Sequence, residues 1–177
     1  MRLSTPRVPA LPPEQWTDEV REIMEPFVSS GRDYNVFRTL MNHPGLAKRW
    51  LVFANHVLTK SSLPEREREL VILRIGHLCN AGYEWNKHAE IGRYLGMSEA
   101  DIESSRSGPD TEGLEERDRL LLRATDELHG DAFISDATWQ GLSAHLSTEQ
   151  LMDLVFTVGQ YNMVSMALNS FGVQYDS

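Results

Sequence analysis

The chain has 177 residues, enough for one domain with its own core, and 41% of them are hydrophobic. Its formal net charge of −9 disfavours nucleic acids and anionic membranes as partners, because both bind clustered positive charge. A single cysteine, Cys79, excludes an intrachain disulfide and a zinc site with two or more thiolates, and it fits a reducing, cytoplasmic compartment.

The first part of the chain predicts an extended arm followed by short helices. Four prolines within residues 1–13 favour an extended arm, and no apolar stretch of secretory-signal length follows the first cations. Apolar residues at helical spacing predict a helix that starts at Pro13 and is closed by Pro26 and Gly31. Two short helices joined by a turn follow, at 37–41 and 46–58.

The segment 64–79 predicts the central helix of the core, because it starts with a proline and acidic residues and becomes largely apolar. Gly82 breaks it, and a second helix covers 83–95. Ser98 and Asp101 predict a capping box for a short helix, and a polar loop spans 104–113.

The last part of the chain predicts helices at 114–130, at 135–142 and from a capping box of Ser147 and Gln150 onward. Residues 154–175 carry no charge over the length of a membrane span, but polar side chains such as Thr157 favour a buried helix of a globular protein. No alternation of period two appears, so we expect an all-α single domain of about eight helices over residues 1–177.

Residues capable of proton transfer concentrate where the two central helices meet. Glu69 and His77 share a face of the first helix, and Glu84 and His88 lie four residues apart on the second. A carboxylate beside an imidazole can work as an acid/base pair near neutral pH. The alternatives are a surface contact for Glu84 and His88, a core role for His77, and a metal site, although no HExxH-type spacing is present.

Other polar and aromatic residues have two readings as well. Tyr83 and Trp85 are core residues or the wall of a pocket, and Arg74 either holds a substrate carboxylate or pairs with a glutamate. The polar residues of the last helix either bond neighbouring helices or orient a polar ligand. They are Gln160, Tyr161, Asn162 and Asn169.

The segments 69–74 and 83–88 make the sequence resemble the carboxymuconolactone decarboxylase family, which includes alkylhydroperoxidase D. The block Tyr83-Glu84-Trp85-x-x-His88 is the most specific part and resembles a subgroup of that family. Similar stretches at 37–44 and 161–163 extend the likeness over most of the chain.

This resemblance implies an alkylhydroperoxidase D-like helical bundle that assembles into trimers or hexamers. In the peroxidase branch, a glutamate and a histidine matching Glu69 and His88 form a proton relay for a Cys-x-x-Cys-x-x-x-His motif. The two cysteine positions are Ala81 and Glu84 here, so we expect no dithiol peroxidase chemistry.

The resemblance to the decarboxylase branch implies loss of carbon dioxide from a small carboxylated lactone, without a cofactor. We also expect no bound metal, because no HExxH-type spacing is present. We hypothesise that His88 is the general acid/base, that Glu69 orients it, and that Glu84 or Tyr83 assists. The candidate substrate-binding residues are His77, Arg74, Trp85, Tyr161, Asn162 and Asn169. A related isomerase and a non-catalytic oligomer that binds a small molecule are the alternatives.

Overall fold

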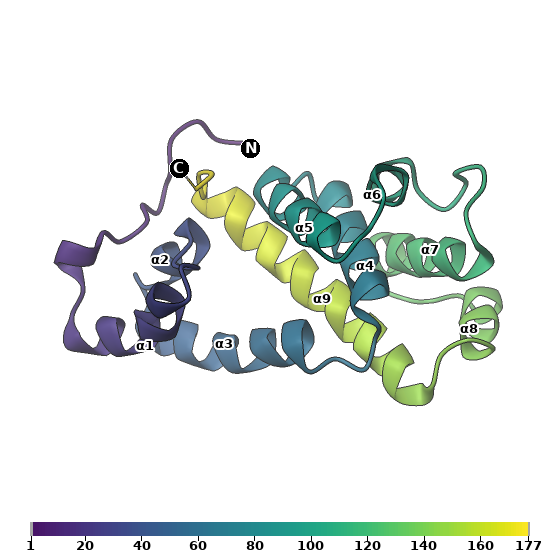
Figure 1. The fold of residues 1–177 in the computed structure, drawn as a ribbon, viewed down its shortest axis with the longest axis horizontal. Helices are drawn as coiled ribbons and strands as arrows, with labels where there is room; N and C mark the ends of the chain where they lie inside the picture. The colour runs from purple at the N-terminus through teal and green to yellow at the C-terminus, as the bar shows by residue number, and fades with distance from the viewer. Residues whose placement is uncertain (1, 177) are drawn as a thin grey trace.

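The computed structural model describes residues 2–176, which form nine α-helices, one short 3₁₀ helix and no strand (Figure 1). The helices are η1 (Pro13–Gln15), α1 (Asp18–Ser29), α2 (Asn35–Leu40), α3 (Pro44–Thr59), α4 (Glu65–Leu78), α5 (Gly82–Tyr94), α6 (Glu99–Ser107), α7 (Glu116–Asp131), α8 (Asp136–Ser143) and α9 (Thr148–Phe171). The predicted all-α class is confirmed.

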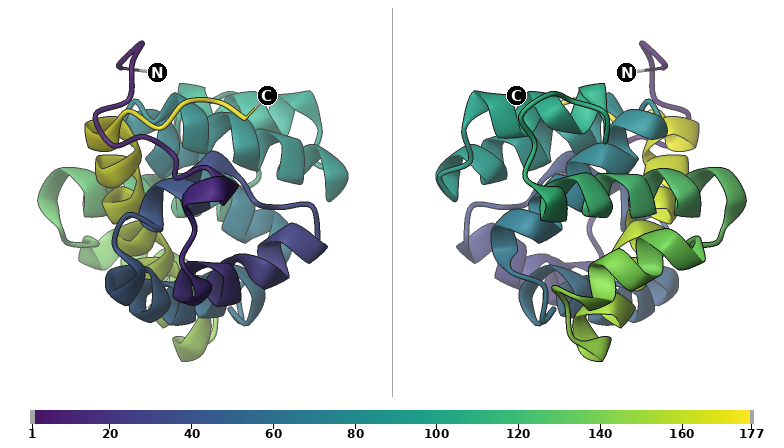
Figure 2. Two further views of the ribbon diagram at one scale, coloured as in Figure 1. Left: turned by 90° about the vertical axis from the view of Figure 1, so that its left-hand side faces the viewer. Right: turned by 90° about the vertical axis from the view of Figure 1, so that its right-hand side faces the viewer.

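Helix α4 occupies the middle of the fold and packs against α5, α6, α7 and α9. Every residue from Arg68 to Gly76 is buried, as expected for a central helix whose second half is apolar. The α1–α3 helices lie at one end of the molecule, and α7 and α8 lie at the other (Figures 1 and 2). Polar residues on α4 and α5 are therefore held inside the bundle.

Both expected boundaries of the first helix differ in the structure. Pro13 begins the short η1, and α1 starts at Asp18, where the Thr17 side chain accepts a hydrogen bond from the Val20 N–H. Pro26 lies inside α1 and does not end it. The missing proline N–H removes one helical bond, but the buried face of α1 still packs against its neighbours.

The polar loop expected at 104–113 is shorter, because α6 continues to Ser107. Ser104 and Ser105 donate their hydroxyls to carbonyls within the helix, so these residues do not interrupt it. The two predicted capping boxes, at Ser98 and Ser147, are both present.

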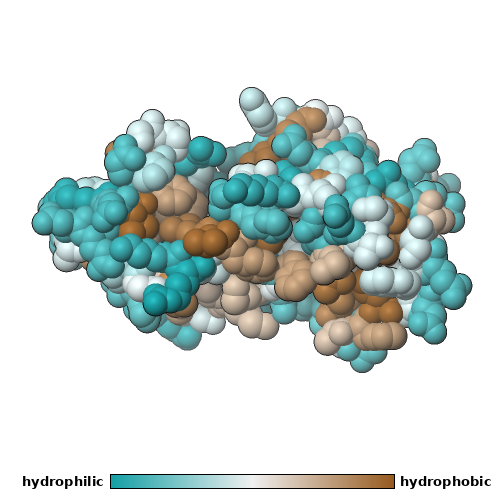
Figure 3. Space-filling view, turned by 90° about the horizontal axis from the view of Figure 1, so that it is seen from below, coloured by the Kyte–Doolittle hydropathy of each residue, from teal (hydrophilic) through white to brown (hydrophobic). Residues whose placement is uncertain are grey.

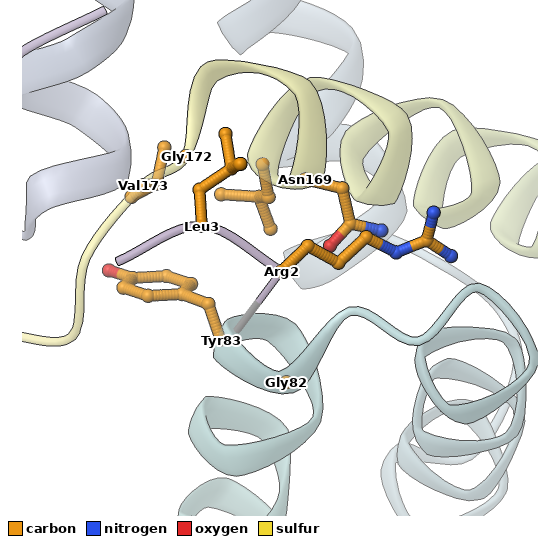
Figure 4. A pocket seen from close by; sticks show the side chains of 8 residues that line it. Arg2, Leu3, Gly82, Tyr83, Asn169, Gly172 and Val173 are labelled. Carbon is orange, nitrogen blue, oxygen red and sulfur yellow. The ribbon is translucent and has the colours of Figure 1, made fainter. Parts of the chain in front are cut away.

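The proline-rich arm lies against the carboxyl end of α9. The N–H groups of Arg7 and Val8 donate to the Phe171 carbonyl at 2.8 and 3.1 Å. Gly172 ends α9 with a φ of +70°, and a Cβ there would lie 3.1 Å from Leu3 Cδ1. Figure 4 shows Leu3 beside this turn, around a cavity of about 10 Å³ between the arm, α5 and α9.

Among the described helices, α9 included, none combines the length and the apolar character that a membrane span requires.

Candidate functional site

Glu69 of α4 and His88 of α5 form a buried ion pair across the two central helices. The imidazole Nδ1 lies 2.5 Å from Glu69 Oε2, and the two residues expose 6% and 0% of their surfaces. Helices α4 and α5 pack closely at Gly76, where a Cβ would lie in ordinary van der Waals contact with the backbone nitrogen of Trp85, at 3.6 Å. The hypothesised partnership of Glu69 and His88 therefore has the geometry it needs.

Glu84 completes the arrangement one helical turn before His88. Its Oε1 lies 3.0 Å from the imidazole Nε2, and the residue is 6% exposed. A neutral imidazole donates from only one nitrogen, whereas the protonated ring donates from both. The imidazolium form of His88 can therefore satisfy both carboxylates at once.

The electrostatics favour that protonated form. Burial alone lowers the pKa of His88, but the adjacent carboxylates of Glu69 and Glu84 outweigh it and raise the pKa to about 10. At neutral pH, His88 holds a proton between two acceptors. We call the chain Glu69–His88–Glu84 the relay.

Tyr161 of α9 covers one side of the relay. Its ring meets the imidazole edge-on, with 4.9 Å between the ring centroids. Burial, and then the charges of Glu84 and Glu69, raise the pKa of the Tyr161 hydroxyl, so that this hydroxyl stays protonated. Tyr161, a candidate substrate-binding residue, therefore lies in contact with His88.

Arg68 is a neighbour of the relay that the sequence reasoning did not single out. It is 6% exposed, and its Nε lies 3.7 Å from Glu69 Oε1. The signal was a cation directly before a glutamate in the helix expected at the core. Its positive charge offsets part of the carboxylate charge buried beside it.

Tyr83 and Arg74 point to partners outside the relay. The Tyr83 hydroxyl donates to Asp176 Oδ2 at 2.8 Å. The Arg74 guanidinium makes a two-pronged ion pair with Asp126, at 2.5 and 2.8 Å, and also donates to two α6 carbonyls. A pairing role for Arg74 was one of the two readings, although the partner is an aspartate.

The remaining candidates fall into two further groups. Asn162 accepts a hydrogen bond from the Cys79 thiol, and Asn169 donates to the Cys79 carbonyl. His77 and Trp85 line a pocket of about 550 Å³ at the junction of α4 and α5. His88 is not among the residues that line this pocket. The structure therefore does not bring all the predicted residues into one site.

A metal site has no support in the part of the chain that the structure describes. No group of three or more histidine, cysteine, aspartate or glutamate side chains there could hold a metal ion.

The arrangement of the helices is similar to that of several solved structures. A peroxidase-related protein from Ralstonia eutropha JMP134 with an alkylhydroperoxidase AhpD core superimposes with a TM-score of 0.84, at 18% identity over 97% of this chain and 93% of that one. A peroxidase-related protein from Silicibacter sp. TM1040 also superimposes with a TM-score of 0.84, at 18% identity over 100% of this chain and 95% of that one. The debrominase Bmp8, solved as a cysteine-to-alanine variant in complex with 2,3,4-tribromopyrrole, superimposes with a TM-score of 0.75. The two chains are 13% identical over 98% of this chain and 94% of that one.

The fold is therefore that of the AhpD-like helical proteins. Residues 44–126, which include both relay helices, match the model of the carboxymuconolactone decarboxylase family. The family resemblance drawn from the sequence is thereby confirmed, while the subgroup stays a prediction. No curated protein matches the chain in sequence.

Proposed function

We propose that the protein is a cofactor-independent lyase that decarboxylates a small carboxylated lactone or a similar ring compound. The observation that carries this proposal is the buried relay, in which one imidazole binds a carboxylate at each nitrogen. Such a group stores a proton in a fixed position, which is what an acid/base catalyst requires. The family match over residues 44–126 supports the same reaction class.

The proposed reaction needs one proton and no redox step. The bond between the ring and the carboxylate breaks, carbon dioxide leaves, and the electron pair enters the unsaturated ring. A proton is then added to a ring carbon. We assign this proton to His88. Glu69 holds the imidazole ring of His88 at Nδ1, and Glu84 lies at Nε2, the nitrogen that passes the proton on.

The fold is compatible with a small cyclic ligand. The debrominase Bmp8, which shares the fold at 13% identity, was solved in complex with a brominated pyrrole. The thiol chemistry of other AhpD-like proteins is not proposed. The chain has a single cysteine, Cys79, and its thiol donates a hydrogen bond to Asn162 on α9.

The test is carbon dioxide release from a panel of small carboxylated lactones and unsaturated ring acids. We expect the native chain to turn over at least one of them, and His88→Ala and Glu69→Ala to reduce the rate about a hundredfold or more, the scale of a lost acid/base group. Circular dichroism confirms that each variant is folded. Turnover that survives both substitutions would exclude the relay as the catalyst.

A second candidate function is a non-catalytic oligomer that binds a small molecule. It is favoured by the separation of the α4–α5 pocket from the relay, since His88 does not line that pocket. Binding of panel compounds without release of carbon dioxide or any change in their NMR spectra would support it. A changed spectrum without carbon dioxide would instead indicate an isomerase.

We also propose that the protein acts in the cytoplasm as a homo-oligomer, a trimer or a hexamer as the family resemblance implies. Hydrophobic residues gather on one face of the molecule (Figure 3). Large apolar side chains follow one stripe of α9 and are 47–60% exposed. They are Met152, Phe156, Met163 and Met166. An exposed apolar stripe of this kind is typical of a surface that another chain covers.

A further inference from the structure

Residues 173–176, which we call the tail, join the start of α2 to the start of α5. The Asp176 carboxylate makes the central contacts. Its Oδ1 accepts the backbone N–H of Asn35 at 2.6 Å, and its Oδ2 accepts the hydroxyl of Tyr83 at 2.8 Å. The Lys87 ammonium lies 3.1 Å from the same Oδ2. One carboxylate therefore holds together three segments that are far apart in the sequence.

The tail has further contacts that fix its own position. The Asn35 side chain donates to the carbonyls of Gln174 and Tyr175, both at 3.2 Å. The Tyr175 ring stacks on the Tyr83 ring, with 6.2 Å between the ring centroids and an interplanar angle of 10°. Figure 4 shows the Tyr83 side chain extending from the start of α5 toward the chain that follows α9. The Asp176 carboxylate is thus presented to α5 by a segment that is itself anchored.

The two α5 residues that bind Asp176 lie beside the two that belong to the relay. Tyr83 and Lys87 occupy the positions directly before Glu84 and His88. Both pairs are spaced by four residues, so they follow neighbouring stripes of the same stretch of helix. The contacts of Asp176 therefore span the same length of α5 as the contact of Glu84 with His88.

The start of α5 lacks a side-chain cap. Its N-cap residue is Ala81, and no side-chain hydrogen bond caps the helix. The first N–H groups of a helix have no partner within the helix, and local opening begins at such ends. Glu84 lies in this first turn, whereas His88 lies in the next turn and is held there by Glu69 of α4. Opening of the first turn would separate Glu84 from His88 and leave the Glu69 contact in place.

We propose that Asp176 is a positioning residue of the relay, which keeps the first turn of α5 closed and thereby keeps Glu84 at His88 Nε2. It acts through Tyr83 and Lys87, which it binds directly. The effect of Asp176 on turnover rests on the proposed lyase function, whereas its effect on the hydrogen bonds of the relay does not.

Nuclear magnetic resonance of the full chain with ¹⁵N-labelled histidine tests this proposal. At neutral pH the imidazolium of His88 should give two slowly exchanging N–H protons, one for each carboxylate. In Asp176→Ala we expect the Nε2 proton, which faces Glu84, to exchange with solvent about tenfold faster, the scale of one charge-assisted hydrogen bond. The Nδ1 proton, which faces Glu69, should keep its exchange rate. Tyr83→Phe removes the hydroxyl that Asp176 accepts, so it should act in the same direction.

The matched control is Asp153→Ala near the start of α9. Asp153 also joins two segments, because its Oδ2 accepts the N–H and the hydroxyl of Ser62, both at 2.6 Å. Its loss should leave both exchange rates of His88 unchanged.

Three results would overturn the proposal. The first is that the Nε2 proton of His88 exchanges as fast in the native chain as in Asp176→Ala. The second is that both imidazole protons respond alike, and the third is that Asp153→Ala has the same effect as Asp176→Ala. Carbon dioxide release is not measured, so failure of the proposed lyase function leaves this test unaffected.

Discussion

His88 is held at both ring nitrogens, and the two carboxylates need not contribute equally to its chemistry. Glu69 is fully buried, whereas Glu84 is 6% exposed. We predict that Glu84→Gln, which keeps the shape of the side chain but removes its charge, lowers the lyase rate about a hundredfold. The measurement is the initial rate of carbon dioxide release.

Glu90→Gln is the control for that substitution, because it makes the same change on the exposed side of the same helix. It should leave the rate within about twofold, since exposed charges of this kind contribute little. Equal rates for the two variants would show that Glu84 has only a structural role.

The same ion pairs predict how stability depends on pH. The pKa of His88 is raised from 6.5 to about 10 in the folded chain. Its contribution to stability is therefore fully present below pH 6.5 and is lost as pH rises toward 10. We predict that the free energy of unfolding decreases across this window more steeply in the native chain than in His88→Gln. Parallel curves in urea titrations would contradict the raised pKa.

Sequence reasoning reached some of these residues and missed others for a physical reason. Glu69 and His88 could be found because a carboxylate in an apolar helix and a motif histidine are both local signals. The ion pair of Arg74 with Asp126 could not be predicted, because the two residues are 52 positions apart and only the packing of α4 on α7 brings them together. Local patterns identify chemistry, whereas pairing depends on tertiary structure.

At the scale of the helices, the sequence patterns that predicted structure correctly were periodic apolar spacing and paired capping residues. Both capping boxes are present because each joins two hydrogen bonds within four residues. The helix end predicted at Pro26 is wrong, because packing of the buried α1 face outweighs the local preference of one proline. Pro13 does start a helix, but it is the short η1 and not α1. The ends of helices are therefore less predictable than their existence.

The end of α9 supplies a prediction at this scale. Gly172 has a left-handed backbone, and a Cβ there would lie 3.1 Å from Leu3 Cδ1 and 3.2 Å from the Thr5 carbonyl oxygen. We predict that Gly172→Ala destabilises the chain by about 1–3 kcal/mol, the cost of a strained residue. Amide exchange should also show faster exchange at Arg7 and Val8, which bond Phe171.

Gly130→Ala is the matched control, since a Cβ at Gly130 meets nothing within 4 Å and the residue lies inside α7. It should leave the chain as stable or stabilise it by up to about 1 kcal/mol, as expected for alanine in a helix. A native-like melting curve for Gly172→Ala would show that the arm does not constrain this turn.

At the scale of the whole molecule, the most informative features join segments that no local pattern connects. Arg2 and Tyr175 come from opposite ends of the chain and line one pocket. The arm, predicted to be extended, hydrogen-bonds the end of α9 through Arg7 and Val8. The exposed apolar side chains of α9 are a separate surface, formed by one helix.

The homo-oligomer proposed above would bury the exposed apolar stripe of α9 in its interface. Met163 and Met166 are 47% and 60% exposed, and a charge at either position would have to be buried in an interface that uses this stripe. We predict that Met163→Glu combined with Met166→Glu shifts the native oligomer to a smaller species in light scattering, with an unchanged circular dichroism spectrum. Tyr94→Glu is the control, because Tyr94 is 89% exposed at the end of α5 and outside the stripe. A native chain that is monomeric, or an unchanged mass for the double variant, would show that α9 does not form the interface.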